Sequence, residues 1–426
     1  MGGTRTRRAD HHAELTDFIM SISSPARTSA EFIALMALTF SLIAMSIDGM
    51  LPALGDIAAD LSVRDPNDRQ LVLAAFFAGL SVGQFIYGPI SDSTGRKPAM
   101  YAGIGCFIVG GLICAFATDF PMMLAGRALQ GFGAAGPRIV GTAMVRDLYA
   151  GSPMARIMSF VMAVLILVPV LAPSIGQLIL LIADWRAIFY GLAVAGMIDF
   201  LWLARRRPET LAPSDRVPLS IGRILRSAKE AITNRVTLGY SVATGFVFGA
   251  VISYLGTAQQ IFQEQYGTGK MFSVYFGLLA AGIGVASVIN GRLVVRFGMR
   301  NLSKWALRSV CILAAGFLLT TILLHGHPPL WLFMCFMTAL FFFNGMLFSN
   351  YNALAMEPMG HIAGVAAAII ASASTLVAVS TGTSIGRLYD GTVTPLFAGF
   401  AGLALAAFLV TEWAESGRGK PVTNPN

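Results

Sequence analysis

The stretch of sequence that decides the fold reads GPISDSTGRKP, over residues 88–98. A long apolar run stands on each side of it, so it is a short polar connection between two apolar segments. Gly88 leaves room where two helices approach, and Gly95 permits a tight reversal of the chain. The carboxylate of Asp92 can lie against a helix N-terminus, a contact worth up to about 2 kcal/mol when partly buried. We interpret the stretch as a structural loop, the alternative being a solvated basic turn.

The composition places most of the chain in lipid. Of its 426 residues, 55% are hydrophobic and 12% are charged, and the mean hydropathy of +0.69 excludes a soluble globular protein. Apolar runs near the length that spans a bilayer recur along the chain, as at Phe32–Ile47, Met100–Ala117 and Leu330–Leu347. They lack the two-residue alternation of a membrane barrel, so they must be helices.

About twelve such runs fit the chain, and we expect an all-α membrane protein with two pseudo-symmetric six-helix bundles around a central cavity. The expected helix centres are residues 41, 80, 109, 130, 168, 193, 246, 281, 313, 341, 372 and 403. The expected organisation is a tail over residues 1–29, a bundle over 30–203, a basic linker over 204–235, a second bundle over 236–414 and a tail over 415–426.

An internal repeat supports this division. Gly88 and Gly95 bracket the loop between helices 2 and 3, and Gly291 and Gly298 bracket the loop between helices 8 and 9 with the same spacing. Repeated halves that face each other across a site near the bilayer midplane are the architecture of a secondary transporter.

Charge is distributed unequally between alternate loops. Basic residues gather at Arg96 with Lys97, at Arg138 with Arg146 and Arg156, in the linker 204–235, and over Arg292–Arg308. The intervening loops carry acids instead, namely Asp56, Asp60, Asp65, Asp68, Asp119, Asp184, Glu264 and Asp390. This positive-inside pattern predicts a multi-pass protein of the bacterial inner membrane with both termini in the cytoplasm.

Three stretches resemble signature motifs of the major facilitator superfamily of transporters: residues 88–98, 124–136 and 168–177. The resemblance implies that the loop after helix 2 is a conformational switch. It also implies that Asp92 meets the start of helix 11, near Pro358–Ala363, and so holds an outward-open state. The residues assigned to the switch are Gly88, Asp92, Gly95, Arg96, Lys97 and Asp147.

The helix 4 motif is carried by Arg127, Gln130, Gly131, Gly133 and Gly136. An arginine near bilayer depth costs about 2.5 to 3.5 kcal/mol on insertion scales, so Arg127 should face a wet cavity or an acid. The alternative is an arginine that snorkels to the outer interface. The three glycines also spell a dinucleotide fingerprint, but no strand precedes them, and we interpret them as a helix-packing face.

In helix 5, the motif that resembles an antiporter signature contains Pro169, Ala172, Pro173 and Gly176. Its Ala-Pro-x-x-Gly form resembles the branch that exports bicyclomycin and chloramphenicol, although Ala172 and Gln177 replace two expected glycines. The alternative is that the prolines only kink the helix.

Asp48, near the end of helix 1, is the candidate proton carrier, with Arg127 as its partner. Asp48 lies eight residues before Asp56, and Arg127 lies eight after Asp119, so each is about 12 Å along its helix and both reach one depth. We expect a switch in which Asp48 is ionised and paired with Arg127 in one state, and protonated and unpaired in the other. The alternative is an aspartate that merely ends helix 1 at the interface.

Four polar residues at membrane depth are candidates for the substrate cavity: Gln84, Tyr254, Asn344 and Asn350. The alternative for each is a hydrogen bond to a neighbouring helix. The four cysteines lie in apolar runs, so neither a disulfide framework nor a metal site is implied.

These features favour a proton-coupled antiporter that exports small drug-like molecules by alternating access, as a monomer, with lipid, protons and the substrate as its partners and no nucleic acid. No phosphate-binding loop appears, so the energy source is the proton gradient and no cofactor is expected. Export of a cellular metabolite, such as an amino acid or short peptide, is the alternative. An enzyme, channel or sensor is a third, and no convergent nucleophile, base or metal cluster supports an enzyme.

Overall fold

The computed structural model describes residues 25–416, so the tail residues 1–24 and 417–426 lie outside it. Between those limits the chain forms twelve helices of 20 or more residues. In the N-terminal half these are α2 (Pro25–Asp48), α4 (Leu71–Thr94), α5 (Arg96–Ala115), α6 (Phe120–Leu148), α7 (Gly151–Leu180) and α8 (Arg186–Arg206). In the C-terminal half they are α10 (Arg235–Gln259), α11 (Phe272–Phe297), α12 (Met299–Leu323), α13 (Leu330–Met356), α14 (Ala363–Gly386) and α15 (Thr394–Ser416).

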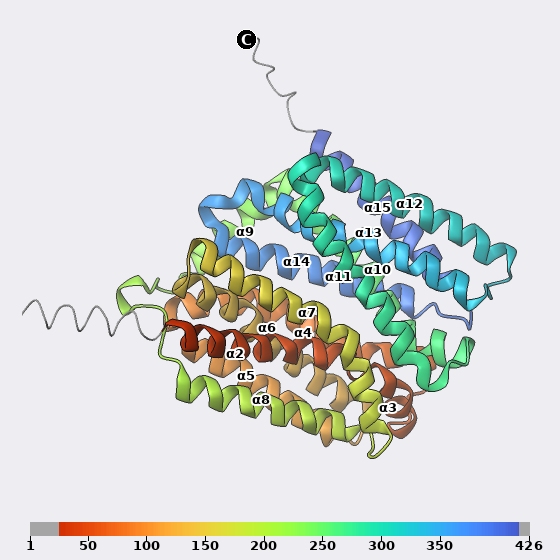
Figure 1. Ribbon diagram of the computed structural model, residues 1–426, viewed down its shortest axis with the longest axis horizontal. Coiled ribbons are helices and arrows are strands. Elements are labelled where there is room, and N and C mark those ends of the chain that lie inside the picture. The colour runs from red at the N-terminus through yellow and green to blue at the C-terminus, as the bar shows by residue number, and fades with distance from the viewer. Residues whose placement is uncertain (1–24, 417–426) are drawn as a thin grey trace, which may run out of the picture.

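Each expected helix centre falls inside one of these twelve helices. The two halves form two bundles that lie against each other, with the first half below the second in Figure 1. Helices α4 and α14 pack together across the boundary, and so do α7 and α11. The second and fifth helices of one half therefore meet the fifth and second of the other. The prediction of a twelve-helix protein in two bundles around a central cavity is confirmed.

Shorter elements join the long helices within the described chain. They are η1 (Leu51–Ala53), α3 (Leu54–Asp60), η2 (Pro66–Gln70), η3 (Pro213–Asp215), α9 (Ile221–Thr233), η4 (Gln260–Gln265), η5 (Gly269–Met271) and η6 (Glu357–Ile362). We call the end of the molecule that holds α9 and the start of α2 the linker end, and the end that holds α3 and η4 the distal end (Figure 1).

The outer surface of the helices is apolar. Ile182, Val295 and Ile312 are 89%, 88% and 72% exposed, although they lie in or next to helices long enough to cross a bilayer. Exposed apolar side chains on such helices face lipid hydrocarbon rather than water.

The two repeated glycines form the same turn in both halves. Gly95 joins α4 to α5 with a φ of 111°, and Gly298 joins α11 to α12 with a φ of 76°. A positive φ is easy for glycine and strained for residues with a Cβ, so each helix pair reverses over a single residue. Gly88 is different: a Cβ there would lie 3.8 Å from the Cβ of Ala368, an ordinary contact, so its small size is not required in this state.

Several hydrogen bonds and ion pairs join the halves at the distal end. Arg69 donates to Gln259 at 2.6 Å and forms an ion pair with Glu264 at 2.7 Å. Gln70 donates to the carbonyl of Gly386, and Arg387 pairs with Asp68 at 2.6 Å. These residues, which we call the distal gate, close the boundary between the halves at that end.

Candidate functional site

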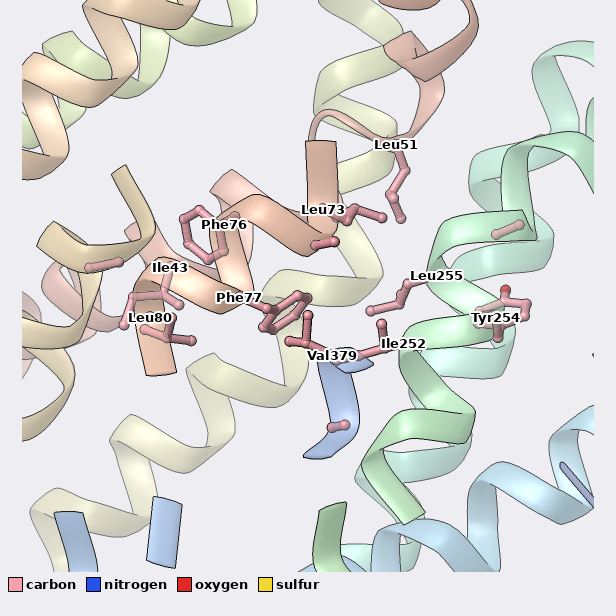
Figure 2. Packing of buried hydrophobic residues seen from close by; sticks show 14 of the residues in the cluster. Ile43, Leu51, Leu73, Phe76, Phe77, Leu80, Ile252, Tyr254, Leu255 and Val379 are labelled. Atoms are coloured by element: carbon pink, nitrogen blue, oxygen red, sulfur yellow. The ribbon is translucent and has the colours of Figure 1, made fainter. Parts of the chain in front are cut away.

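A cavity of about 460 Å³ lies between the two halves, and we call it the central cavity. Two charged side chains line it, Asp48 of α2 and Arg138 of α6, and both come from the N-terminal half. The C-terminal half contributes no charged residue but most of the aromatic side chains, namely Phe248, Tyr254, Phe276, Phe341 and Phe348, beside Phe40 and Phe77 of the N-terminal half. Figure 2 shows apolar residues of the two halves, such as Phe77 and Leu255, gathered at their boundary.

A smaller cavity of about 220 Å³ adjoins the central cavity. The two share Phe248 and Phe348, and the smaller one also reaches Ser287 of α11 and Ser349 of α13. Ser349 lies seven residues before the end of α13 at the linker end. The open space therefore continues from the central cavity toward the linker end, while the distal gate closes the opposite side.

Asp48 is the last residue of α2 and is 6% exposed. Its carboxylate has no hydrogen bond or ion pair with any residue that the structure describes, although it lines the central cavity. A buried carboxylate without a partner is costly as an anion, because it has lost its hydration and gained nothing in return. The position therefore suits a group that gains and loses a proton.

Helix α7 holds the end of α2 in place. Gly176 packs so closely against Gly49 that a Cβ on Gly176 would overlap the Gly49 carbonyl oxygen. Pro169 lines the central cavity, Ala172 and Pro173 are buried, and both prolines interrupt the hydrogen bonds of α7. The small residues and prolines expected in an antiporter motif thus form the surface on which Asp48 is positioned.

Arg127 of α6 is fully buried within the N-terminal half. Its guanidinium donates to the hydroxyl of Ser46 at 2.9 Å, to the amide oxygen of Gln130 at 2.6 Å and to the carbonyl of Val72 at 3.2 Å. It also lies over the ring of Phe76, 4.5 Å from the centroid. Arg127 does not snorkel to an interface, and it ties together α2, α4 and α6.

The structure does not bring Asp48 and Arg127 together. Arg127 reaches Ser46, which is two residues before Asp48 and therefore about 200° away around the helix. The two groups lie at similar depth, but Asp48 faces the cavity and Arg127 faces the bundle interior. The ion pair expected for one state of the switch is not formed in this state.

Arg138 is a site residue that the sequence analysis missed. We counted it among basic residues of a loop, whereas it lies inside α6, ten residues before the helix ends at Leu148. Eleven residues separate it from Arg127, which is close to three turns, so both project from one side of α6. The sequence offered no signal for it, because a basic residue near the end of a helix looks the same inside the helix and in the loop that follows.

Asp199 of α8 is a second buried acid that the sequence analysis missed. It is fully buried, and it accepts a hydrogen bond from Thr39 of α2 at 2.8 Å. It does not line the central cavity. The sequence signal that could have identified Asp199 is an acidic residue inside the apolar run that forms α8, the sixth long helix.

The four cavity candidates separate into two pairs. Tyr254 lines the central cavity and Asn344 lines the smaller one. Asn350 instead forms a reciprocal amide pair with Asn290, with both distances 3.0 Å, and Gln84 accepts from Thr375 of α14. Gln84 and Asn350 thus do not line either cavity but connect helices, which is the alternative considered from sequence.

The switch loop is held by Arg96. Its guanidinium pairs with Asp92 at 2.5 Å and with Asp147 at 2.8 Å, while the amine of Lys97 donates to the carbonyl of Ala204. No hydrogen bond or ion pair joins Asp92 to α14 or to residues 358–363 in the described structure, so the polar contact expected near Pro358–Ala363 is not formed. Because that contact was expected for an outward-open state, its absence agrees with the closed distal gate.

The linker adds an acid to this loop. The carboxylate of Glu209 accepts from the backbone N–H groups of Arg96 at 2.8 Å and Lys97 at 3.0 Å, at the start of α5. Burial alone would raise the pKa of Glu209, but bonds from Leu211, Lys97, Arg96 and Thr210 hold this pKa below its usual value. Glu209 is therefore ionised at neutral pH and caps the helix.

Comparison with known proteins agrees with this architecture. The sequence model of the Major Facilitator Superfamily matches residues 33–383. The uncharacterized MFS-type transporter YdgK of Bacillus subtilis is 33% identical over 76% of this chain and 81% of its own. The bicyclomycin resistance protein homolog of Haemophilus influenzae is 29% identical over 86% of this chain and 91% of its own.

Solved structures share the fold. A crystal structure of a D-xylose–proton symporter has a TM-score of 0.70 at 15% identity, and it covers 90% of this chain and 97% of its own. The chain therefore belongs to the Major Facilitator Superfamily, and it is a multi-pass membrane transporter of small molecules, not an enzyme, that needs no cofactor.

Proposed function

We propose that this protein is a proton-coupled antiporter that exports small drug-like molecules from the cytoplasm by alternating access. The observation that carries the proposal is the unpartnered carboxylate of Asp48 at the wall of the central cavity, beside helix α7 with its two internal prolines. A carboxylate that substrate and proton can both reach couples their movements, because only one of them occupies the site at a time.

The proton gradient is sufficient for this work. One proton that moves through about 100 mV and one pH unit supplies roughly 3.7 kcal/mol, which sustains a solute gradient of about 500-fold. The bicyclomycin resistance relative supports a drug-like substrate over a cellular metabolite.

The same proposal includes orientation. The basic linker end would lie in the cytoplasm of a bacterium, with both termini on that side of the inner membrane. In that orientation the distal gate closes the outer side, and the cavities extend toward the cytoplasm. The state described would then be the one that loads substrate from inside the cell, with a single chain as the transport unit.

We further propose that Arg127 positions Asp48 through Ser46 rather than by direct pairing in this state. Its bonds to α2, α4 and α6 fix the depth and rotation of the end of α2. The ion pair would form only if α2 rotated by about half a turn in another state.

The test compares two buried acids of the same half. The protein is reconstituted in liposomes that contain a pH-sensitive dye, a proton gradient is imposed, and chloramphenicol is added to wild type, Asp48→Asn and Asp199→Asn. We expect substrate-evoked proton flux in wild type and Asp199→Asn and none in Asp48→Asn. Normal flux in Asp48→Asn would exclude Asp48 as the carrier, and lost flux only in Asp199→Asn would assign that role to α8.

A further inference from the structure

Arg138 is a cation without a neutralising partner among the residues that the structure describes. No hydrogen bond or ion pair of its side chain is found among residues 25–416, whereas Arg69, Arg96, Arg127 and Arg300 all have partners there. Arg138 lies inside α6, ten residues before the end of that helix, and lines the central cavity. An arginine at such depth is unfavourable unless an anion or water satisfies its five donors.

The folding of α6 accounts for where Arg138 points. Gly133 and Gly136 pack against the backbone of α5 so closely that a Cβ on either would collide with it. Arg138 is two residues beyond Gly136, about 200° around the helix, and so it faces away from α5 toward the cavity. One turn further on, Thr142 lines the same cavity and donates its hydroxyl proton to the Arg138 carbonyl. The Thr142 hydroxyl oxygen can therefore accept a hydrogen bond from a ligand but cannot donate one.

Asp48 does not serve as the internal partner of Arg138. Asp48 ends α2, while the ring of Phe40, eight residues earlier, lies next to Gly141 of α6, one turn beyond Arg138. Eight residues of helix rise by about 12 Å, so the acid and the arginine occupy different levels of the cavity. The N-terminal wall therefore presents a negative group toward the distal end and a positive group toward the linker end.

From this arrangement we propose that Arg138 binds an anionic group, a carboxylate or its equivalent, on the transported molecule. The planar guanidinium suits bidentate contact with a carboxylate, and the aromatic side chains of the opposite wall suit a flat apolar body. The preferred substrate is thus an aromatic acid or a zwitterion whose positive end lies toward Asp48. This inference rests on the proposed function, because it assigns the substrate class of the same cavity.

Two dyes with one skeleton test the proposal. Rhodamine 110 carries a free carboxylate, and rhodamine 123 is its methyl ester without that anion. Binding to the purified full chain is measured by fluorescence anisotropy for wild type, Arg138→Gln, Arg138→Lys and Arg146→Gln. Arg146 is the matched control, because it is an exposed arginine of the same helix that does not line the cavity.

We expect wild type to bind rhodamine 110 at least tenfold more tightly than rhodamine 123. Arg138→Gln should remove that preference by weakening rhodamine 110 alone, Arg138→Lys should retain part of it, and Arg146→Gln should retain all of it. If wild type binds rhodamine 110 no more tightly than rhodamine 123, that result alone overturns the proposal. Equal weakening of both dyes in Arg138→Gln overturns it too, because that result indicates a structural role.

Failure of the proposed function gives a different result. If the carboxylate preference is present but neither dye evokes proton flux in liposomes, proton-coupled export is wrong and the anion site stands. If rhodamine 123 evokes proton flux and no carboxylate preference exists, export stands and the anion site is wrong.

Discussion

The two halves of this transporter share a scaffold and differ at the cavity. The N-terminal half contributes both charged groups, Asp48 and Arg138, and the C-terminal half contributes Tyr254 and four phenylalanines. Tyr254 stacks on Phe276 and meets Phe341 edge-on, which gives that wall a defined aromatic surface. The N-terminal half thus supplies the charged groups of the cavity, and the C-terminal half supplies most of its aromatic surface.

The scaffold itself remains similar at the linker end. Arg96 follows the Gly95 turn and pairs with Asp147 at the end of α6, while Arg300 follows the Gly298 turn and pairs with Glu357 after α13 and with Glu415 of α15. Each arginine cluster lies beside its copy of the glycine turn, although Arg300 occupies the place of Lys97 in the repeat. Duplication thus kept the two glycine turns and an arginine cluster beside each, while the walls of the cavity diverged in charge.

The largest effect on transport should come from a substitution that displaces Asp48 without changing any charge in the cavity. Gly176→Ala puts a methyl group where the Gly49 carbonyl lies and must push the end of α2 away from α7. Displacement of a reacting group by about 1 Å can cost on the order of 100-fold in rate, and we expect that loss in proton-coupled transport. Gly191→Ala in α8, where a Cβ meets open space, is the control. Wild-type flux in Gly176→Ala would show that this contact does not position Asp48.

The aromatic wall should respond more weakly and without regard to charge. Phe248 lies at both cavities and meets Phe77 edge-on, with ring centroids 5.6 Å apart. Burial of a phenylalanine side chain contributes about 1.5 to 3 kcal/mol. The affinity of Phe248→Ala for rhodamine 110 and its affinity for rhodamine 123 should therefore fall by the same factor, roughly 10 to 100. Phe248→Leu should lose less. A loss confined to one dye would contradict the assignment of shape recognition to this half.

Helix number, helix position and the repeated turns could be predicted from the sequence, because membrane-spanning helices require long apolar runs and each reversal at Gly95 and Gly298 requires a positive φ. The presence of Asp48 and Arg127 at one depth followed from helical rise alone. Their separation on opposite sides of α2 did not follow, because rotation of a helix is set by packing, here by Gly49 against Gly176.

Arg138 shows a different limit of sequence reasoning. Basic residues at loops report topology, and a basic residue a few turns inside a helix looks the same until the helix end is known. Asn350 and Gln84 show the converse, since amides at membrane depth bond to neighbouring helices when those helices lie within reach. Sequence identifies polar residues in the membrane but does not decide which of them face a cavity.

At the distal gate both halves contribute charged groups, unlike at the central cavity. Arg69 of the N-terminal half meets Glu264 and Gln259 of the C-terminal half there. Hydrogen bonds to charged groups contribute about 1.5 to 3 kcal/mol, so Arg69→Gln should raise the fraction of molecules open at the distal end about tenfold or more. The readout is the labelling rate of Leu255→Cys by a membrane-impermeant maleimide, with the native cysteines replaced by serine. Arg186→Gln is the matched control, because Arg186 pairs with Asp60 inside one half. Equal rates in both variants would mean that Arg69 does not hold the gate.

The smallest expected effect concerns an asymmetry between the two glycine turns. Glu209 of the linker caps the first turn of α5, and a charge at a helix N-terminus contributes up to about 1 kcal/mol. Glu209→Gln should therefore speed hydrogen exchange of the Arg96 and Lys97 amides by up to about fivefold, while amides at the start of α12 serve as an internal reference. Because the pKa of Glu209 is depressed, its contribution is complete above the unfolded value near 4.3 and declines only as pH falls below it. Exchange in the wild type should show no loss of the cap between pH 7 and pH 6, and a loss there would mean that this cap responds to the same protons that drive transport.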